Sequence, residues 1–124
     1  MRTTTGCAQG GGLSEKPADA ARRALDNSLY SVCLVDGDDV VGIGRVIGDG
    51  GCFFEVVDIV VLPAYQGKGH GRLIMDAIAQ YLDEAVPKGA FVSLIAGEGV
   101  SRFYERYGFR VRPPSAPGMS YVKT

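Results

Sequence analysis

Three runs of β-type residues stand out between residues 29 and 62. Leu29–Val35 is rich in strand-forming side chains and is followed by Asp36-Gly37, a dipeptide typical of hairpin turns. Val40–Ile47 is the second run, and Cys52–Leu62 is the third, which is apolar at all positions except Glu55 and Asp58. Because short turns separate the runs, the pattern predicts an antiparallel meander whose third strand is covered on both faces.

From Arg72 onward the apolar period changes from that of a strand to that of a helix. Apolar side chains recur every three or four residues up to Ala85, and Val86-Pro87-Lys88-Gly89 ends the pattern. Ala90–Ala96 is a continuous apolar run of strand length, which favours a buried parallel strand. The segment Cys52–Ala96 is therefore predicted to be a βαβ unit with a right-handed crossover.

The two ends of the chain carry weaker signals. Residues 1–12 are glycine-rich and lack periodicity, so we expect a flexible tail with a weak strand at Arg2–Thr5. No repeat or domain boundary is visible, and the whole pattern predicts a single α/β (α+β) domain over residues 1–124. The other expected elements are helices at Ser14–Leu25 and Val100–Tyr107 and strands at Phe109–Arg112 and Met119–Lys123.

Composition narrows the class of protein. The formal net charge of −1 gives no electrostatic case for nucleic acid or an anionic membrane as a partner. No apolar run reaches the roughly 18 residues needed to span a bilayer, and the N-terminus lacks the apolar core of a signal peptide. Cys7, Cys33 and Cys52 form no CxxC pair, and we interpret them as small hydrophobic residues of a protein in the reducing cytoplasm.

A glycine-rich turn, Gln66-Gly67-Lys68-Gly69-His70-Gly71, joins the third strand to the long helix. Alternate glycines let the backbone approach a ligand closely, and the first amides of a helix have no intrahelical partners. Lys68, His70 and Arg72 also gather positive charge at the positive end of the helix dipole, which is unfavourable unless an anion binds there. The turn therefore predicts a site for a polyphosphate.

Two common phosphate-binding patterns are excluded. A P-loop requires a glycine, four residues and then Gly-Lys-Ser/Thr, and the chain has no such string. A dinucleotide fingerprint requires a glycine where this chain has Arg72, and an acidic residue near Ala90, where there is none within about five residues.

The turn resembles the Q/R-x-x-G-x-G/A pyrophosphate loop of the GNAT superfamily of acetyl-CoA-dependent N-acetyltransferases. The preceding DIVVLPAY resembles the fourth strand of that family, and Phe103–Phe109 (FYERYGF) resembles its later helix and following strand. The resemblance covers Leu29 to Phe109. It implies a mixed, mostly antiparallel central sheet flanked by helices, acetyl-CoA as co-substrate, and no metal.

The resemblance also implies how the donor and acceptor bind. The pantetheine arm is expected in a cleft where the strands Cys52–Leu62 and Ala90–Ala96 separate, and the acetyl group is expected to pass to a primary amine of a small molecule or peptide by direct attack in a ternary complex. The implied cofactor-binding residues are Ile59, Val60 and Val61 for pantetheine, and Gln66, Gly67, Lys68, Gly69, His70, Gly71 and Arg72 for the pyrophosphate.

Acetyl transfer to an amine needs a base for the amine and an acid for the departing thiolate. Tyr104 lies where many members of the family carry the proton-donating tyrosine, although an aromatic there also packs a helix on a sheet. Glu55 and Asp58 are the candidate bases, with Glu55 slightly favoured, and structural roles for both, or water as the base, stay open. Strict alternation places the two carboxylates on opposite faces of the strand unless a bulge lies between them.

Other charged side chains are less specific. His70 is the only histidine, which excludes a two-histidine metal site and favours a solvent-facing or phosphate-adjacent ring. Arg45 and Arg102 are interpreted either as surface charges or as contacts of an acidic acceptor.

The chain departs from the family pattern at both ends. Little precedes Leu29, where members usually carry elements that help to build the acceptor pocket. We expect either an open acceptor site suited to a peptide, or a homodimer that completes the pocket and covers bare sheet edges. The rival hypotheses are a non-catalytic CoA- or acyl-CoA-binding module or sensor, and a subunit whose fold serves assembly alone.

Overall fold

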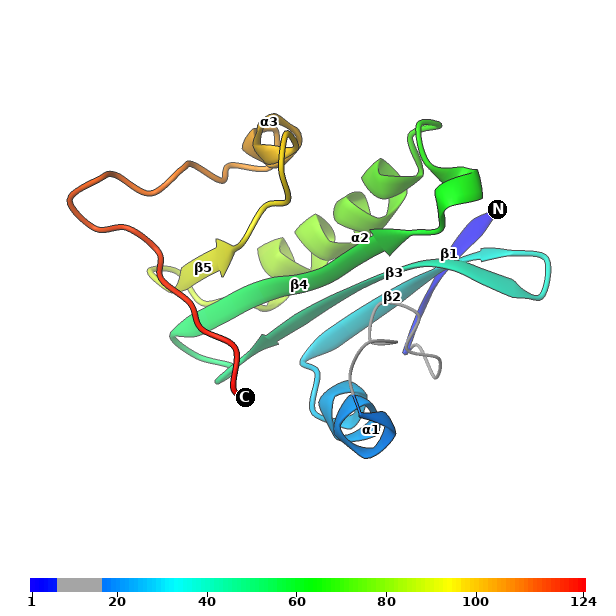
Figure 1. Cartoon of the computed structure of the whole chain (residues 1–124), viewed down its shortest axis with the longest axis horizontal. Helices are drawn as coiled ribbons and strands as arrows, with labels where there is room; N and C mark the ends of the chain where they lie inside the picture. The colour runs from blue at the N-terminus through cyan, green and yellow to red at the C-terminus, as the bar shows by residue number, and fades with distance from the viewer. Residues whose placement is uncertain (7–16) are drawn as a thin grey trace.

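The computed structural model describes residues 1–6 and 17–124 and contains a single mixed sheet (Figure 1). Its strand order is β1-β2-β3-β4-β5, antiparallel from β1 to β4 and parallel between β4 and β5. The predicted mixed, mostly antiparallel sheet flanked by helices is confirmed. The elements are β1 (Arg2–Thr5), α1 (Ala18–Asp26), β2 (Tyr30–Asp36), β3 (Asp39–Gly48), β4 (Phe53–Val61), the 3-10 turn η2 (Pro63–Tyr65), α2 (His70–Ala85), β5 (Phe91–Leu94) and α3 (Ser101–Glu105).

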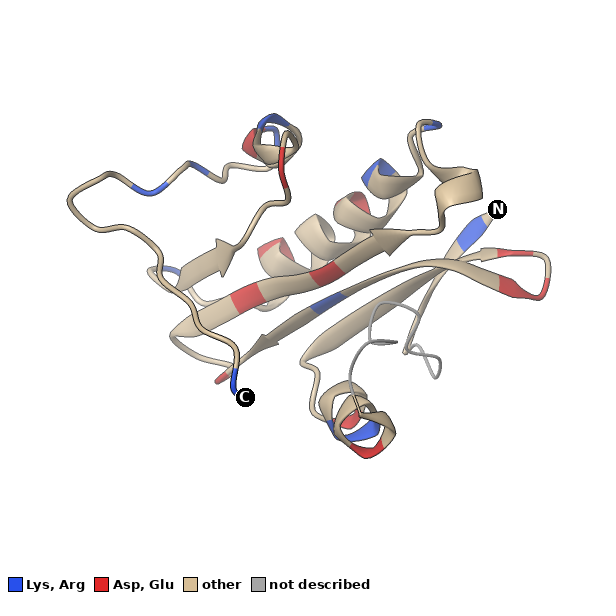
Figure 2. Ribbon diagram, viewed as in Figure 1, with Lys and Arg blue, Asp and Glu red and all other residues tan. Residues whose placement is uncertain are grey.

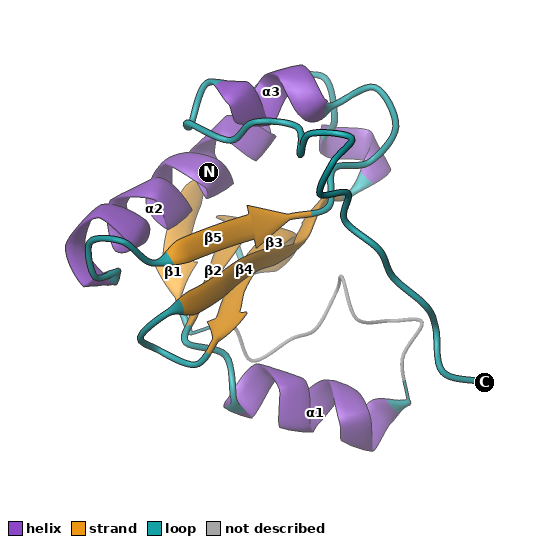
Figure 3. Cartoon of the chain, turned by 90° about the vertical axis from the view of Figure 1, so that its left-hand side faces the viewer, coloured by secondary structure: helices purple, strands orange, loops and turns teal. Residues whose placement is uncertain are grey.

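The helices form a layer on each side of the sheet. Figure 3 shows α2 and α3 above one face and α1 below the other. The rings of Tyr30 in β2 and Tyr81 in α2 stack with centroids 4.6 Å apart, which fixes the C-terminal half of α2 over the sheet.

The core lies between α2 and the sheet, and two glycines of β3 set how closely the layers pack. A Cβ on Gly44 would come within 2.8 Å of the side chains of Ile74 and Ile78, and one on Gly42 within 2.9 Å of Ile74. The Gly-Ile-Gly sequence of β3 therefore leaves room for the branched side chains of α2. The fully buried residues of α2 are Ile74, Met75 and Ile78, and the sheet contributes Val32, Leu34, Val46, Phe54 and Val56 to the same core.

A β-bulge in β4 sorts the side chains of that strand between the two faces. Ile43 pairs with Val60, but Arg45 pairs with Val57, so β4 carries one more residue than β3 over this stretch. Within the described chain, Asp58 is the one non-glycine residue with a positive φ, at 55°. Glu55 lies opposite Ile47, two residues along β3 from Arg45, to which Asp58 is bonded. Glu55 and Asp58 therefore share one face, because the bulge that was named as the exception to strict alternation is present.

The strands expected at Phe109–Arg112 and Met119–Lys123 are absent. The segment after α3 runs as a long loop to the C-terminus (Figure 1). No described segment pairs with the outer edge of β5, and a strand without a ladder partner leaves its backbone groups unbonded. At the other end, the predicted strand Arg2–Thr5 is confirmed as β1. Helix α1 begins at Ala18, and the expected start at Ser14 lies outside the described residues. Residues 7–12 of the expected flexible tail also lie outside them.

The cysteines differ from their interpretation as simple hydrophobic residues. Cys33 is buried in β2 and is disulfide-bonded, which the cysteine spacing does not predict. Cys52 is a free thiol, but it is exposed, so its interpretation as a buried residue is wrong. Within residues 1–6 and 17–124, no helix has the length and apolarity to cross a bilayer, and no cluster of three metal-ligating side chains occurs.

Candidate active site

The two parallel strands separate partway along β4. Pairing between β4 and β5 runs from Phe53 and Phe91 to Val56 and Leu94 and then ends. Beyond that point β4 still pairs with β3 as far as Val61. Over residues 57–61, the backbone groups of β4 that face away from β3 therefore have no strand partner in the described chain. A cleft of this kind offers a row of hydrogen-bond donors and acceptors to an extended ligand.

The glycine turn lies just after the same strand and leads directly into α2. Gly67 and Gly69 both have left-handed backbones, with φ of 78° and 82°, and a Cβ on either would meet no atom within 4 Å. Gly69 is the N-cap of α2, and no side chain caps the first amides of the helix. Lys68 and Arg72 are exposed beside these amides. The turn is therefore an open, positively charged cradle lined by unbonded N–H groups.

Side-chain hydrogen bonds hold the cradle in place. The amide of Gln66 donates to the carbonyl of Val61 over 2.8 Å, which ties the turn to the end of β4. Nδ1 of His70 lies 2.8 Å from the carbonyl of Tyr65 and must carry the proton of that bond, because a carbonyl only accepts. The hydroxyl of Tyr65 donates in turn to Asp36 in the β2–β3 hairpin, a bond that raises the pKa of the tyrosine. His70 was expected to face solvent or a phosphate. Its ring is half-buried, and its Nδ1 atom is used in the hydrogen bond to the Tyr65 carbonyl.

A cavity of about 970 Å³ lies between α2, β5, α3 and the C-terminal segment. Its lining includes Glu55 from β4, Ser93 from β5 and Tyr104 from α3, so two of the predicted catalytic residues border the same cavity. Asp58 and the glycine turn do not line this cavity.

Tyr104 is packed by aromatic neighbours while its hydroxyl reaches the cavity. Its ring contacts Phe103 and Phe109 edge-on, with centroids 5.0 and 6.4 Å away, and the residue is only 9% exposed. The hydroxyl makes no hydrogen bond to the described residues. Because every buried polar side-chain atom among those residues has a partner, the hydroxyl oxygen itself must be accessible to solvent. Burial raises the pKa of Tyr104, which keeps it protonated near neutral pH.

The two candidate bases differ in what binds them. Oε1 of Glu55 accepts a hydrogen bond from the Ser93 hydroxyl at 3.2 Å, and Oε2 has no partner among the described residues. Asp58 is bound by the guanidinium of Arg45 at 2.9 Å. Figure 2 shows the acidic positions of β4 beside the basic position of β3, whereas the other charged positions of the sheet lie at the ends of strands. Glu55 keeps accepting capacity toward the cavity, whereas Asp58 is held by an ion pair.

Sequence reasoning missed Ser93 and misjudged Arg45. Arg45 is 6% exposed, so its interpretation as a surface charge is wrong. An arginine in the middle of an apolar strand is a usable signal, because a buried charge needs a partner and the next strand carries two carboxylates. No comparable signal marks Ser93, since its role depends on the parallel pairing with Glu55.

Comparisons with known proteins agree with this arrangement. The sequence model of the "Acetyltransferase (GNAT) domain" matches residues 26–111. An uncharacterized N-acetyltransferase, ycf52, of Pyropia yezoensis is 30% identical over 87% of this chain and 63% of its own length. Serotonin N-acetyltransferase 2, chloroplastic, of Oryza sativa is 30% identical over 91% of this chain and 58% of its own. A Staphylococcus aureus structure described as "Probable Acetyltransferase" is 43% identical, with a TM-score of 0.81 over 88% of this chain and 81% of that one.

The chain thus spans about three fifths of the length of the curated relatives that it matches. The matched domain, by contrast, covers more than two thirds of this chain and includes both the glycine turn and Tyr104. The chain belongs to the GNAT family of acetyltransferases.

Proposed function

We propose that the protein transfers the acetyl group of acetyl-CoA to a primary amine by direct attack in a ternary complex. The observation that carries this proposal is the open cradle of left-handed Gly67 and Gly69 at the uncapped start of α2, directly after the unpaired end of β4. A cradle for phosphates and an adjacent free strand edge suit a ligand with a pyrophosphate at one end and an extended amide-bearing arm at the other.

The donor site follows from these two features. The amides that open α2, together with Lys68 and Arg72, would hold the pyrophosphate, because their positive potential is otherwise uncompensated. The pantetheine arm would bond backbone groups of residues 59–61 in the manner of an added strand. The thioester would then lie near the point where β4 and β5 part.

Glu55 is assigned the role of general base. A lysine-like amine with a pKa near 10.4 is neutral in only about one molecule in 2500 at pH 7, so removal of its proton limits the reaction. Glu55 lines the cavity, and its Oε2 atom has no competing partner among the described residues. Ser93 holds the other oxygen and so orients the carboxylate.

Tyr104 is assigned the role of general acid. The departing thiolate has a pKa of about 8.5, below that of a tyrosine hydroxyl. Burial raises the pKa of Tyr104 further, so the hydroxyl serves first as a hydrogen-bond donor that stabilises the developing thiolate and only then as a proton source. Its exposure to the cavity makes both roles sterically accessible.

A thermal-shift panel with acetyl-CoA, CoA, ATP and NAD tests the donor. A ligand at 100 times its dissociation constant adds about 2.7 kcal/mol to the free energy of unfolding, which raises Tm by several degrees in a domain of this size. Both CoA species are expected to give this shift, and ATP and NAD are not. Absence of a shift with either CoA species would refute the proposal.

An acceptor screen follows, with detection of the free thiol of released CoA. Serotonin and a lysine-containing histone-tail peptide belong in the panel, because one relative is named a serotonin N-acetyltransferase and another a histone acetyltransferase. Turnover with any primary amine supports acetyl transfer. CoA binding without turnover of small amines or peptides would favour the non-catalytic CoA-binding module.

A further inference from the structure

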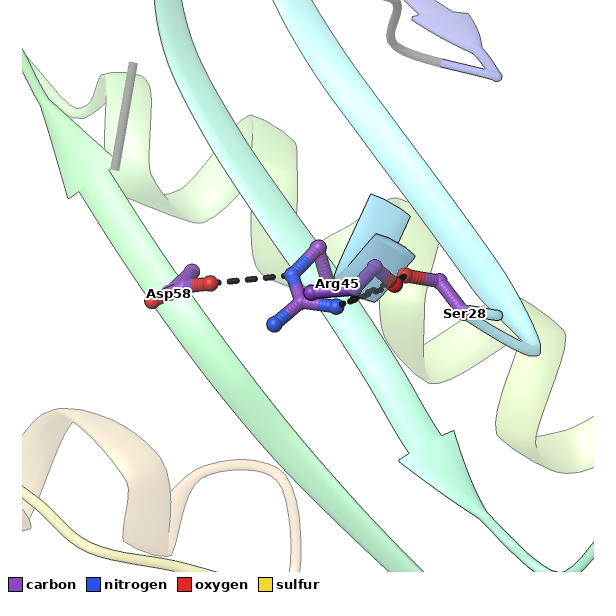
Figure 4. A network of polar contacts seen from close by, with 4 residues as sticks. Ser28, Arg45 and Asp58 are labelled. Atoms are coloured by element: carbon purple, nitrogen blue, oxygen red, sulfur yellow. Dashed lines mark hydrogen bonds and ion pairs between the residues drawn. The ribbon is translucent and has the colours of Figure 1, made fainter. Parts of the chain in front are cut away.

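One guanidinium, that of Arg45, joins the bulge of β4 to the end of α1 (Figure 4). Nε of Arg45 donates to Oδ2 of Asp58 over 2.9 Å. Nη1 donates to the carbonyl of Ala24 over 3.1 Å and to the hydroxyl of Ser28 over 2.7 Å. The planar guanidinium thus satisfies acceptors from two elements at once, and its side chain is almost fully buried.

The residue that Arg45 binds has an unfavourable backbone conformation. Asp58 has a φ of 55°, in the left-handed region where a side chain with a Cβ is disfavoured. Asparagine and aspartate tolerate this region better than most residues, and a fixed carboxylate favours it further. The side chain of Asp58 is 21% exposed, and among the described residues Arg45 is the one partner that binds its carboxylate.

The conformation of Asp58 matters because of where it lies. Val56 makes the last pair with β5, and Asp58 follows two residues later, at the mouth of the cleft. A bulge reorients the backbone groups next to it. The left-handed turn at Asp58 therefore determines how those amides of residues 57–61 that face away from β3 are presented to a ligand in the cleft.

We propose that Arg45 is a positioning residue: it holds Asp58 in its left-handed conformation and so orients backbone amides next to the bulge to donate a hydrogen bond to the thioester carbonyl. The carboxylate of Asp58 acts on its own backbone and not on the amine. This inference rests on the proposed use of acetyl-CoA. In this proposal, the buried ion pair between Arg45 and Asp58 supports polarisation of the thioester carbonyl. The same guanidinium also binds the end of α1.

Substitutions at Asp58 separate backbone conformation from charge. Asp58→Gly removes the carboxylate but adopts a positive φ without strain, whereas Asp58→Ala removes the carboxylate and disfavours that φ. Arg45→Met removes the ion pair and keeps most of the side-chain volume. Ser28→Ala is the matched control, because it removes an acceptor just after α1 and leaves the bond between Arg45 and Asp58 intact.

The first readout compares dissociation constants for acetyl-CoA and CoA by calorimetry. Asp58→Ala and Arg45→Met are expected to weaken acetyl-CoA binding by about two- to tenfold relative to CoA, which is the effect of one lost hydrogen bond. Asp58→Gly and Ser28→Ala are expected to keep the wild-type ratio. The second readout is the carbonyl stretch of bound carbonyl-¹³C acetyl-CoA in the infrared, which should move toward its solution frequency in Asp58→Ala and Arg45→Met only.

A third readout needs no ligand. Amide hydrogen exchange at residues 57–59 of the free protein is expected to be faster in Asp58→Ala and Arg45→Met than in Asp58→Gly. Unchanged exchange, affinity ratio and carbonyl frequency in folded Asp58→Ala would overturn the inference, and so would equal effects of the alanine and glycine variants. Should Arg45→Met not fold, the alanine–glycine pair decides. A wild type that binds neither CoA species rejects the proposed function instead, while exchange still tests the link between Arg45 and the bulge.

Discussion

Glu55 and Asp58 present their carboxylates on the same face of β4, because the left-handed backbone at Asp58 inserts one extra residue into the strand. Their partners are nevertheless different. Glu55 accepts one hydrogen bond from Ser93 and lines the cavity, whereas Asp58 is paired with the buried guanidinium of Arg45. Two carboxylates that look alike in the sequence therefore have different surroundings: one borders the cavity and the other is held by an ion pair.

Replacing each carboxylate by the corresponding amide should affect kcat very differently. Glu55→Gln is expected to lower kcat by about 10²- to 10³-fold with little change in the KM for acetyl-CoA, because it removes the general base. Asp58→Asn should stay within about threefold of wild type, since asparagine tolerates the left-handed backbone and still accepts a hydrogen bond from Arg45. Steady-state kinetics with the amine found in the acceptor screen measure both. A large loss in Asp58→Asn alone would make Asp58 the base.

Tyr104→Phe should reduce catalysis while leaving the fold intact. The phenyl ring keeps its contacts with Phe103 and Phe109, so the free energy of unfolding should change by less than about 1 kcal/mol. Loss of the hydroxyl is expected to lower kcat by about tenfold or more. Because burial raises the pKa of Tyr104, the wild-type protein keeps this donor to a higher pH than an ordinary tyrosine would. An unchanged kcat would show that Tyr104 serves only in packing and is not the general acid.

Alanine at two neighbouring glycines should separate stability from CoA affinity. Gly69 has a φ of 82°, so Gly69→Ala strains the turn by about 1–2 kcal/mol and should weaken CoA binding by about tenfold. Gly71 lies inside α2, and a Cβ there would meet only Phe103, at an ordinary 3.9 Å. Gly71→Ala should therefore raise stability by about 0.5 kcal/mol and keep the affinity. Thermal melts and calorimetry test the pair, and equal affinity losses would contradict it.

The hydrogen bond between Tyr107 and Asp76 should show itself at high pH. The hydroxyl of Tyr107 donates to Oδ1 of Asp76 over 2.7 Å and links the turn after α3 to α2. Burial and this bond raise the pKa of Tyr107 to about 12. Between pH 10 and about 12, the unfolded tyrosine ionises while the folded one does not, so stability falls as pH rises through this window. Tyr107→Phe should remove that part of the fall, measured by urea unfolding at several pH values.

Much of the fold was predictable because hydrophobic periodicity is a local property. The meander, the helix after the glycine turn and the parallel strand that follows it all form where the runs in the sequence predict them. Their predicted burial is wrong in part, because Phe53 of β4 and Phe91 of β5 are 63% and 42% exposed. The expected strand at Phe109–Arg112 is wrong for a physical reason: its side chains suit a strand, but no described segment offers backbone partners for it. A sequence pattern indicates which secondary structure a segment favours, whereas strand pairing depends on the segments that lie beside it in the fold.

By itself, the sequence determined the family, the glycine turn that opens α2 and the candidates for acid and base. These depend on residues that are neighbours in the chain, such as the alternate glycines between Gln66 and Gly71. Only the tertiary structure decided that Glu55 faces the cavity and that Asp58 is bound by Arg45. One extra residue in β4 reverses the face of every side chain beyond it, and the register that reveals this residue exists only when β3 and β4 are paired.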